Sequence, residues 1–251
     1  AAHNVVLVDG LEQATGPARA SAPVEAIITP AYDYAQGTFT DGFTDVATAA
    51  AMHKAYLYRW DIPRENVQDD IVHTRGVLYL RGVGWVVVDR IGTSRPCRIT
   101  PLWHFHPDCT VVRDGQSVVT VDEGVGNLRI QPAAPFAWEI EFVNGREGPD
   151  FQGWYSPIMD VRLPNTCAFY TTDIQQTATF AWVMIPAKGR VPEVDVTILD
   201  APHGAAHLLL RLPDYLPMEV AIRLDEMLPL QFSTGEDVTG HCAVRCCPEN
   251  N

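Results

Sequence analysis

The sequence predicts an all-β protein, a large antiparallel β-sandwich with at most one or two short helices. Polar and apolar residues alternate over Glu139–Phe142, which is the period of a strand with one buried face. The dipeptides Asp114-Gly115 and Asn144-Gly145 favour tight turns between strands. Turn signals of this kind recur about every ten residues along the chain. This rhythm is typical of stacked antiparallel sheets and differs from that of strands joined by crossover helices.

Two apolar runs are expected to form central strands that are buried on both faces. Val5–Val8 and Trp85–Val88 are apolar at every position, whereas a strand with one solvated face would alternate. Gly82 and Gly84 precede the second run, and glycine readily adopts the positive φ angles of a short hairpin connection. Val77–Leu80 is therefore expected to pair with Trp85–Val88.

One helix and one boundary between structural units are expected in the chain. Asp45–Tyr56 is rich in alanine, and Asp45 places a carboxylate near the start of this segment, where it favours a helix. Pro186–Pro192 contains prolines and a glycine and is the best candidate for a boundary. We therefore expect a main β-sandwich over residues 1–185. Residues 186–251 are expected to add strands packed on or beside it, either as a second unit or within the same domain.

The charge of the chain disfavours nucleic acid and membrane surfaces as partners. The net charge is −13, and Lys54 and Lys188 are the only lysines. Affinity for phosphate backbones requires clustered basic residues, and no apolar run reaches the length that spans a bilayer. Cys242, Cys246 and Cys247 lie close together near the end of the chain. Their spacing matches no common zinc pattern, so disulfide or free-thiol roles are preferred over a metal site.

Four segments in a fixed order carry a resemblance to a known family. His3-Asn4 leads into an apolar strand and Asp9-Gly10, and the other segments are His73–Tyr79 with Val86–Asp89, Trp103–Pro107, and Gly153–Pro157. In this series the chain resembles the β-rich C-terminal half of heparinase II/III-like polysaccharide lyases, over roughly residues 3–185. Such enzymes cleave uronic-acid-containing polysaccharides by β-elimination, and the resemblance implies the same substrate class and reaction.

The resemblance also implies what the chain lacks. In the family a helical N-terminal half, an α/α toroid, carries the principal acid–base groups, and this half has no counterpart in the sequence. We therefore expect the chain to be the downstream part of a longer protein, with no catalytic residue of its own and no lyase activity by itself. A periplasmic or secreted location is implied by the resemblance alone.

His3 is a candidate zinc ligand. By resemblance, the histidine of the His-Asn motif helps to hold a zinc ion together with a histidine and an aspartate from farther upstream. Those partners are not in this sequence, and one ligand cannot hold a metal with useful affinity. We therefore expect zinc in the full-length protein and none in this chain alone, where His3 would be a frayed or packed N-terminal histidine.

His104 and His106 form a second candidate metal pair. Residues two apart on a strand lie on one face, so both imidazoles could chelate an ion while Trp103 and Phe105 face the core. The alternative, which we prefer, is that both histidines make hydrogen bonds to strand ends or to a loop.

Three residues are candidates for contact with a substrate. Arg75 could bind a substrate carboxylate in bidentate fashion, or it could pair with Asp69, Asp70 or Asp89 inside the protein, which we prefer. Trp154 and Tyr155 could stack on the apolar face of a sugar ring, although core packing is the simpler expectation for Trp154. The main alternative to a lyase half is a non-catalytic carbohydrate-binding or structural β-sandwich module. A sugar hydrolase or epimerase with an unrecognised carboxylate pair is a third alternative.

Overall fold

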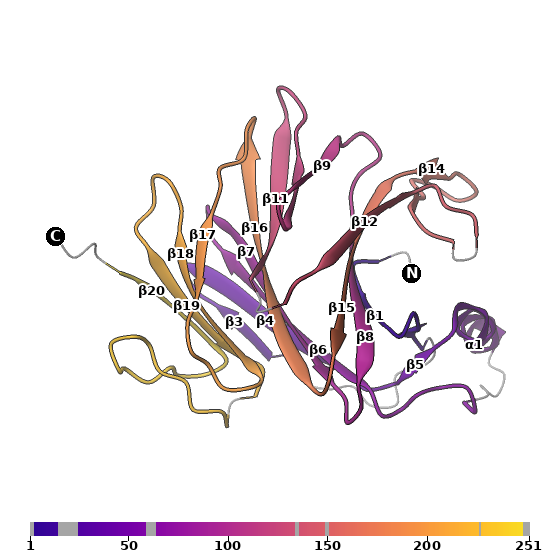
Figure 1. The fold of residues 1–251 in the computed structure, drawn as a ribbon, viewed down its shortest axis with the longest axis horizontal. Coiled ribbons are helices and arrows are strands. Elements are labelled where there is room, and N and C mark those ends of the chain that lie inside the picture. Colours follow the sequence, from indigo (N-terminus) through magenta and orange to yellow (C-terminus); the bar gives the residue numbers. More distant parts are fainter. Residues whose placement is uncertain are drawn as a thin grey trace.

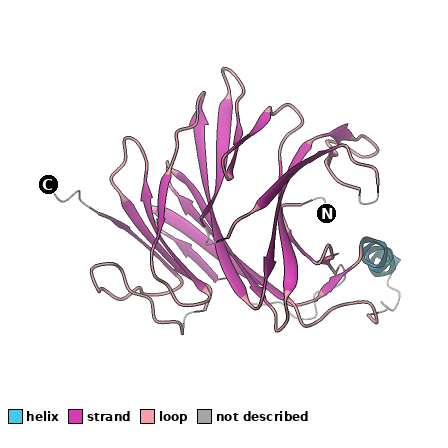
Figure 2. Ribbon diagram, in the orientation of Figure 1, coloured by secondary structure: helices cyan, strands magenta, loops and turns pink. Residues whose placement is uncertain are grey.

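The computed structural model describes residues 3–14, 25–58, 64–133, 136–148, 151–225 and 227–247. Strands dominate these residues (Figures 1 and 2), and the single helix among them is α1 (Val46–Tyr58). The all-β prediction is confirmed. No helix in the described part of the chain has the length and apolar character needed to cross a membrane.

Three antiparallel sheets make up the body of the protein. The large sheet has the order β3 (Glu25–Ile28), β4 (Tyr32–Phe39), β6 (Val72–Leu80), β7 (Gly84–Gly92), β16 (Ala178–Lys188), β11 (Gly126–Ala133), β10 (Ser117–Thr120) and β9 (Val111–Asp114). The small sheet has the order β1 (Val6–Val8), β8 (Cys97–His104), β15 (Thr166–Ile174) and β12 (Glu139–Asn144). The C-terminal sheet has the order β17 (Asp195–Ile198), β18 (Ala205–Arg211), β19 (Met218–Arg223) and β20 (Cys242–Cys246).

Two short strand pairs complete the structure. The first pair is β2 (Glu12–Gln13) with β5 (Phe43–Thr44), directly before α1. The second pair is β13 (Trp154–Tyr155) with β14 (Leu163–Pro164), in the loop that connects β12 to β15. In Figure 1 this second pair lies at the upper right.

The large sheet is the middle layer, because a core of apolar side chains lies on each of its faces. On one face Val87, Trp182 and Phe180 pack against residues of the small sheet, such as Trp103 and Tyr170. On the opposite face the apolar side chains of β6, β7 and β16 pack against β18 and β19, with Leu78, Val86, Val88, Leu208 and Val220 among the residues in this second core. Figure 1 shows the small sheet and the C-terminal sheet on either side of the large one.

This arrangement explains the apolar run Trp85–Val88. Strand β7 pairs with β6 and β16 near the middle of the large sheet, and Val86, Val87 and Val88 are buried. A strand with cores on both faces needs apolar residues at successive positions. The prediction of a central strand that is buried on both faces is confirmed here. The hairpin between β6 and β7 is also confirmed, with Gly82 at φ 76° in its turn.

The run Val5–Val8 does not form a central strand, and this prediction is wrong in position. Strand β1 comprises Val6–Val8, lies at the end of the small sheet's order and pairs only with β8 among the described strands. Its residues are nevertheless buried. Val6 and Val8 join the core toward the large sheet, and Leu7 joins a separate cluster with Leu102 on the other face. Because both faces are covered, an edge strand here has the same apolar pattern as a central one.

The helix prediction is confirmed with a shift of boundaries. The sequence favours Asp45–Tyr56, and α1 spans Val46–Tyr58. Asp45 is the N-cap residue: its carboxylate accepts hydrogen bonds from the Thr48 N–H at 2.9 Å and from the Thr48 hydroxyl at 2.6 Å. Such a cap satisfies a backbone N–H that the first turn leaves unpaired.

The C-terminal strands β17–β20 pack on the large sheet through the second core. Strand β16 continues from Ala178 to Lys188 and therefore extends past residue 185. The division of the chain into residues 1–185 and 186–251 stays a prediction.

Candidate functional site

The His3-Asn4 segment is fastened to the small sheet at the end of β8. The side-chain oxygen of Asn4 accepts a hydrogen bond from the backbone N–H of His104 at 2.8 Å. The Arg75 guanidinium donates to the Asn4 carbonyl oxygen. The Leu102 N–H donates to the carbonyl of Val5 at 2.9 Å. Asn4 is thus held by His104 of the small sheet and by Arg75 of the large sheet, while the His3 side chain is exposed.

Arg75 is held by a buried carboxylate. Its Nε and Nη2 atoms donate to the two oxygens of Asp89, at 2.7 and 3.0 Å, in a bidentate pair. His73 Nε2 lies 2.7 Å from the same carboxylate, and Asp89 is fully buried. Burial alone would raise the pKa of Asp89, but the charge of Arg75 and the hydrogen bond of His73 outweigh it and lower this pKa to about 2. The expected internal pairing is therefore present, with Asp89 as the partner.

The Arg75 side chain also reaches the core between the layers. Its guanidinium lies 5.5 Å from the ring centroid of Trp103, a distance at which a cation is attracted to an aromatic face. Arg75 keeps 22% of its side-chain surface exposed. This residue therefore joins β6, β7, β8 and the Asn4 backbone at one point.

His104 and His106 have different partners. Strand β8 ends at His104, whose Nε2 lies 3.4 Å from Cys167 Sγ, and burial lowers the pKa of His104 to about 4. His106 lies past the strand end and is exposed; its ring packs edge-on against Tyr155 at 5.1 Å. Its Nδ1 accepts a hydrogen bond from the Asp108 N–H at 3.3 Å. Trp103 and Phe105 face the core as expected.

Trp154 and Tyr155 lie in β13. The backbone just before this strand, at Gly153, packs closely against the backbone at Val143 and Gly145 and so fixes the position of β13. Gly153 has φ 75°, and a Cβ atom there would lie 2.8 Å from the Val143 carbonyl oxygen and from the Gly145 nitrogen. Only glycine fits such a place without strain. The Trp154 Nε1–H donates to the Arg146 carbonyl at 3.1 Å, which fixes the indole.

We call Phe151, Trp154 and Tyr155, three aromatic residues of the loop between β12 and β15, the aromatic surface. Phe151 and Trp154 stack on each other, and Tyr155 packs against His106. The rings of Phe151 and Trp154 stack at 5.5 Å with an interplanar angle of 12°, and the Arg162 guanidinium lies 5.1 Å from each ring centroid. Trp154 is half-buried, whereas Phe151 and Tyr155 are 44% and 36% exposed. More exposed apolar side chains follow in the same loop: Ile158, Met159 and Leu163.

The structure connects the predicted residues through short contacts. Arg75 contacts Asn4, next to His3; Asn4 contacts His104; and His106, two residues further along, contacts Tyr155. The sequence did not predict Phe151 or Arg162. Phe151 lies three residues before Trp154 and could have been noticed, but the position of Arg162 depends on the pairing of β13 with β14.

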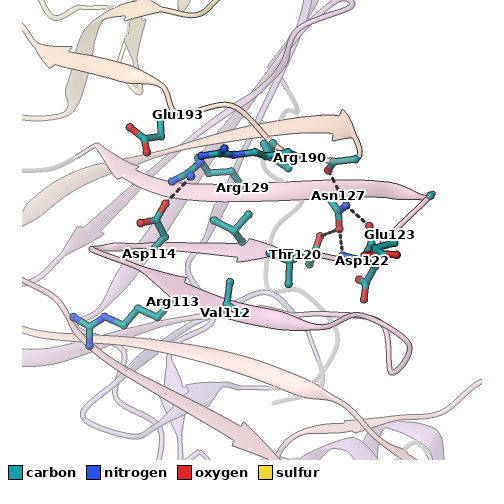
Figure 3. A pocket seen from close by; sticks show the side chains of 15 residues that line it. Val112, Arg113, Asp114, Thr120, Asp122, Glu123, Asn127, Arg129, Arg190 and Glu193 are labelled. Atoms are coloured by element: carbon teal, nitrogen blue, oxygen red, sulfur yellow. Dashed lines mark hydrogen bonds and ion pairs between the residues drawn. The ribbon is translucent and has the colours of Figure 1, made fainter.

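A separate cavity lies on the outer strands of the large sheet, and it contains none of the predicted residues. Its volume is about 550 Å³, and arginines, carboxylates and valines are among the residues that line it. Asn127 shapes one end through hydrogen bonds with Thr120, Asp122 and Gly189, and Arg129 pairs with Asp114 at 2.7 Å (Figure 3). Because both signs of charge are present in similar number, the lining does not select one class of ligand.

The three sheet layers and the aromatic surface define the structural class of the protein. It is an all-β sandwich module with an exposed aromatic surface at one end of its small sheet. Residues 1–197 match the protein family described as heparinase II/III-like, C-terminal. The chain therefore belongs to this family. No curated protein is similar enough in sequence to count as a match.

Solved structures share the fold. A crystal structure of heparan sulfate lyase HepC from Pedobacter heparinus has 16% identity and a TM-score of 0.59, covering 80% of this chain and 28% of that one. A heparinase III gene product has 12% identity and a TM-score of 0.59, covering 88% of this chain and 30% of that one. Another heparinase III structure has 13% identity and a TM-score of 0.54, covering 89% and 27%. The chain thus spans less than a third of the length of these lyases.

Proposed function

We propose that this chain is the C-terminal β-sandwich portion of a polysaccharide lyase that cleaves a uronic-acid-containing polysaccharide by β-elimination, and that it is not catalytic on its own. Family membership and the lyases that share its fold support this proposal. The observation that carries it is the fixed His3-Asn4 segment next to the aromatic surface, since both features lie at the same end of the small sheet.

The chemistry explains why a second half is required. β-Elimination needs a group that neutralises the uronate carboxylate, a base for the proton on C5, and an acid for the leaving oxygen. At the proposed site, the low pKa of the partly buried His104 keeps it neutral near pH 7, and Asp89 is fully buried behind Arg75. A helical toroid from outside this chain is proposed to supply the acid and the base.

The substrate-facing roles in this chain are binding roles. Trp154 and Tyr155 are proposed to stack on sugar rings, because aromatic faces suit the apolar C–H side of a pyranose. Asp89 binds Nε and Nη2 of Arg75, so Arg75 is proposed to meet a substrate carboxylate only through Nη1, which also donates to the Asn4 carbonyl. Its second role is to hold the Asn4 backbone and so to position His3.

Zinc is proposed only for a longer protein. Among the residues that the structure describes, no group of three or more His, Cys, Asp or Glu side chains could hold a metal ion. His3 would be one ligand, and the others would have to come from outside this chain. Elemental analysis of the purified chain tests this: stoichiometric zinc that disappears in His3→Ala would contradict the proposal.

The alternative is a carbohydrate-binding or structural module without any catalytic partner. The aromatic surface favours this module function, because all of its residues belong to this chain. A periplasmic or secreted location is proposed for either function, since a polysaccharide substrate would be met outside the cytoplasm.

The test combines activity and binding. The chain alone is expected to produce no unsaturated uronate from alginate or heparan sulfate, followed by ultraviolet absorbance, while a longer natural protein that contains it does. In native gels that contain these polymers, Trp154→Ala is expected to reduce retardation of the chain. If no natural protein joins the chain to a helical half, the module function is correct instead.

A further inference from the structure

A second pocket lies at the tip of the hairpin between β6 and β7. The hairpin tip, the end of β16 with the segment that follows it, and the loop between β18 and β19 enclose a volume of about 470 Å³. Binding sites for small ligands are usually about 300–1,000 Å³. The lining is mostly apolar, with three aromatic and three proline residues: Tyr79, Trp85, Tyr215, Pro186, Pro192 and Pro213.

The aromatic side chains of this pocket are fixed. Tyr79 and Trp85 are direct cross-strand partners, and their rings stack at 5.2 Å with an interplanar angle of 26°. Tyr215 is 47% exposed, but its hydroxyl donates to the Gly82 carbonyl at 2.9 Å. This bond ties the loop after β18 to the hairpin tip. An exposed ring that is already ordered loses less conformational freedom when a ligand binds.

The charge of the lining restricts the ligand. Among the described lining residues Asp214 is the only charged one, and none of them is a lysine or arginine. A polyanion would therefore meet a carboxylate with no compensating cation. An uncharged ligand with apolar faces and hydroxyl groups fits, because the rings can cover its C–H faces while Asp214 accepts hydrogen bonds.

We propose that this pocket binds an uncharged pyranose unit of an oligosaccharide. The choice of a sugar over a proline-rich peptide, which aromatic grooves also bind, rests on the proposed function, in which the ligand is a polysaccharide. The site is separate from the aromatic surface in its residues and in its charge. One of its walls, Leu212–Tyr215, also lies outside the residues that match the family.

Affinity electrophoresis of the whole chain tests the proposal. Native gels contain glucomannan as the neutral polymer, or alginate as the polyuronate. The chain is expected to be retarded by glucomannan, and Tyr215→Ala is expected to weaken this binding about fivefold to tenfold. Tyr215→Phe keeps the ring but loses the bond to Gly82, so its loss is expected to be smaller. Leu216→Ala, an exposed apolar neighbour outside the lining, is the matched control and is expected to bind as the wild type does.

The outcomes separate this proposal from the proposed function. Retardation by glucomannan that is unchanged in Tyr215→Ala, or absent in the wild type, overturns the pocket assignment. Tyr215-dependent binding of a decaproline peptide without binding of glucomannan also overturns it and identifies a peptide groove. Retardation by alginate and its dependence on Trp154 test the aromatic surface alone. Thermal unfolding of each variant confirms that it is folded before binding is compared.

Discussion

At the residue scale, Asp89 is the link between the middle layer and the His3-Asn4 segment. Its carboxylate orients Arg75, and Arg75 in turn holds the Asn4 carbonyl. A buried carboxylate is stable only when it is paired and hydrogen-bonded. The pairing was one of three that the sequence allowed, because Asp69 and Asp70 lie even nearer to Arg75 in the chain than Asp89 does. Only the register of β6 against β7, which places Arg75 opposite Asp89, decides among them.

Asp89→Asn is expected to destabilise the protein by about 3 kcal/mol or more, because it leaves Arg75 without its partner at a largely buried site. Chemical denaturation followed by circular dichroism measures the change. The matched control is Asp173→Asn, which removes an exposed ion pair with Arg98 and should cost much less, because solvent screens a pair of this kind. Equal losses in the two variants would show that the Asp89 pair is not important for stability.

His104 is expected to make the stability depend on pH in the mildly acidic range. Burial lowers the pKa of His104 from 6.5 to about 4 in the folded protein. Below pH 6.5 the unfolded chain therefore binds a proton that the folded protein does not, and stability falls as the pH drops toward 4. The stability of His104→Asn should fall less steeply over this range. Chemical denaturation at several pH values between 4 and 7 measures these slopes, and a slope unchanged in His104→Asn would refute the assignment.

At the scale of elements, the large sheet shows why the apolar runs were informative and where they misled. Val86 and Val88 face one core and Val87 faces the other, so the run in β7 reflects its place in the middle layer. The run in β1 reflects instead the small cluster around Leu102 and Phe169, which covers the outer face of the small sheet. A local pattern records burial on two faces but not the number of neighbouring strands.

Val87→Asp is expected to unfold the domain, because it buries an unpaired charge in the core between the large and small sheets. Its cross-strand partner Val77 gives the control: it lies directly opposite on β6 but is 36% exposed. Val77→Asp should cost only about 1 kcal/mol. Soluble expression and thermal unfolding compare the two, and a folded Val87→Asp protein would contradict the buried central position.

The loop that carries Trp154 is expected to depend on Gly153. Gly153→Ala combines a positive φ with a close approach to the Val143 carbonyl, whereas Gly189→Ala has the same φ of 75° and open space around the added atom. The first change should cost about 2 kcal/mol more than the second. It should also reduce binding to alginate, because it displaces the Trp154 backbone. Equal stability of the two variants would mean that this loop relaxes freely.

At the scale of the whole molecule, the sequence predicted the layers better than the site. Turn dipeptides and period-two alternation are local, so the strands and hairpins around Gly82 and Gly115 were predictable. The contacts of Asn4 with His104 and of His106 with Tyr155 join residues that are distant in the chain, and no local pattern contains them. The pocket beside Tyr215 is similar, because its walls come from three separate segments.

The proposed function treats the chain as the β-sandwich portion of a lyase whose reaction requires a helical portion from outside this chain. The most direct measurement is the formation of unsaturated uronate from alginate and heparan sulfate by the purified chain, followed by ultraviolet absorbance. No turnover is expected from the chain alone, and clear turnover is expected from a longer natural protein that contains it. Turnover by the chain alone, abolished by changing a residue within it, would overturn the proposed function and place the active site in this chain.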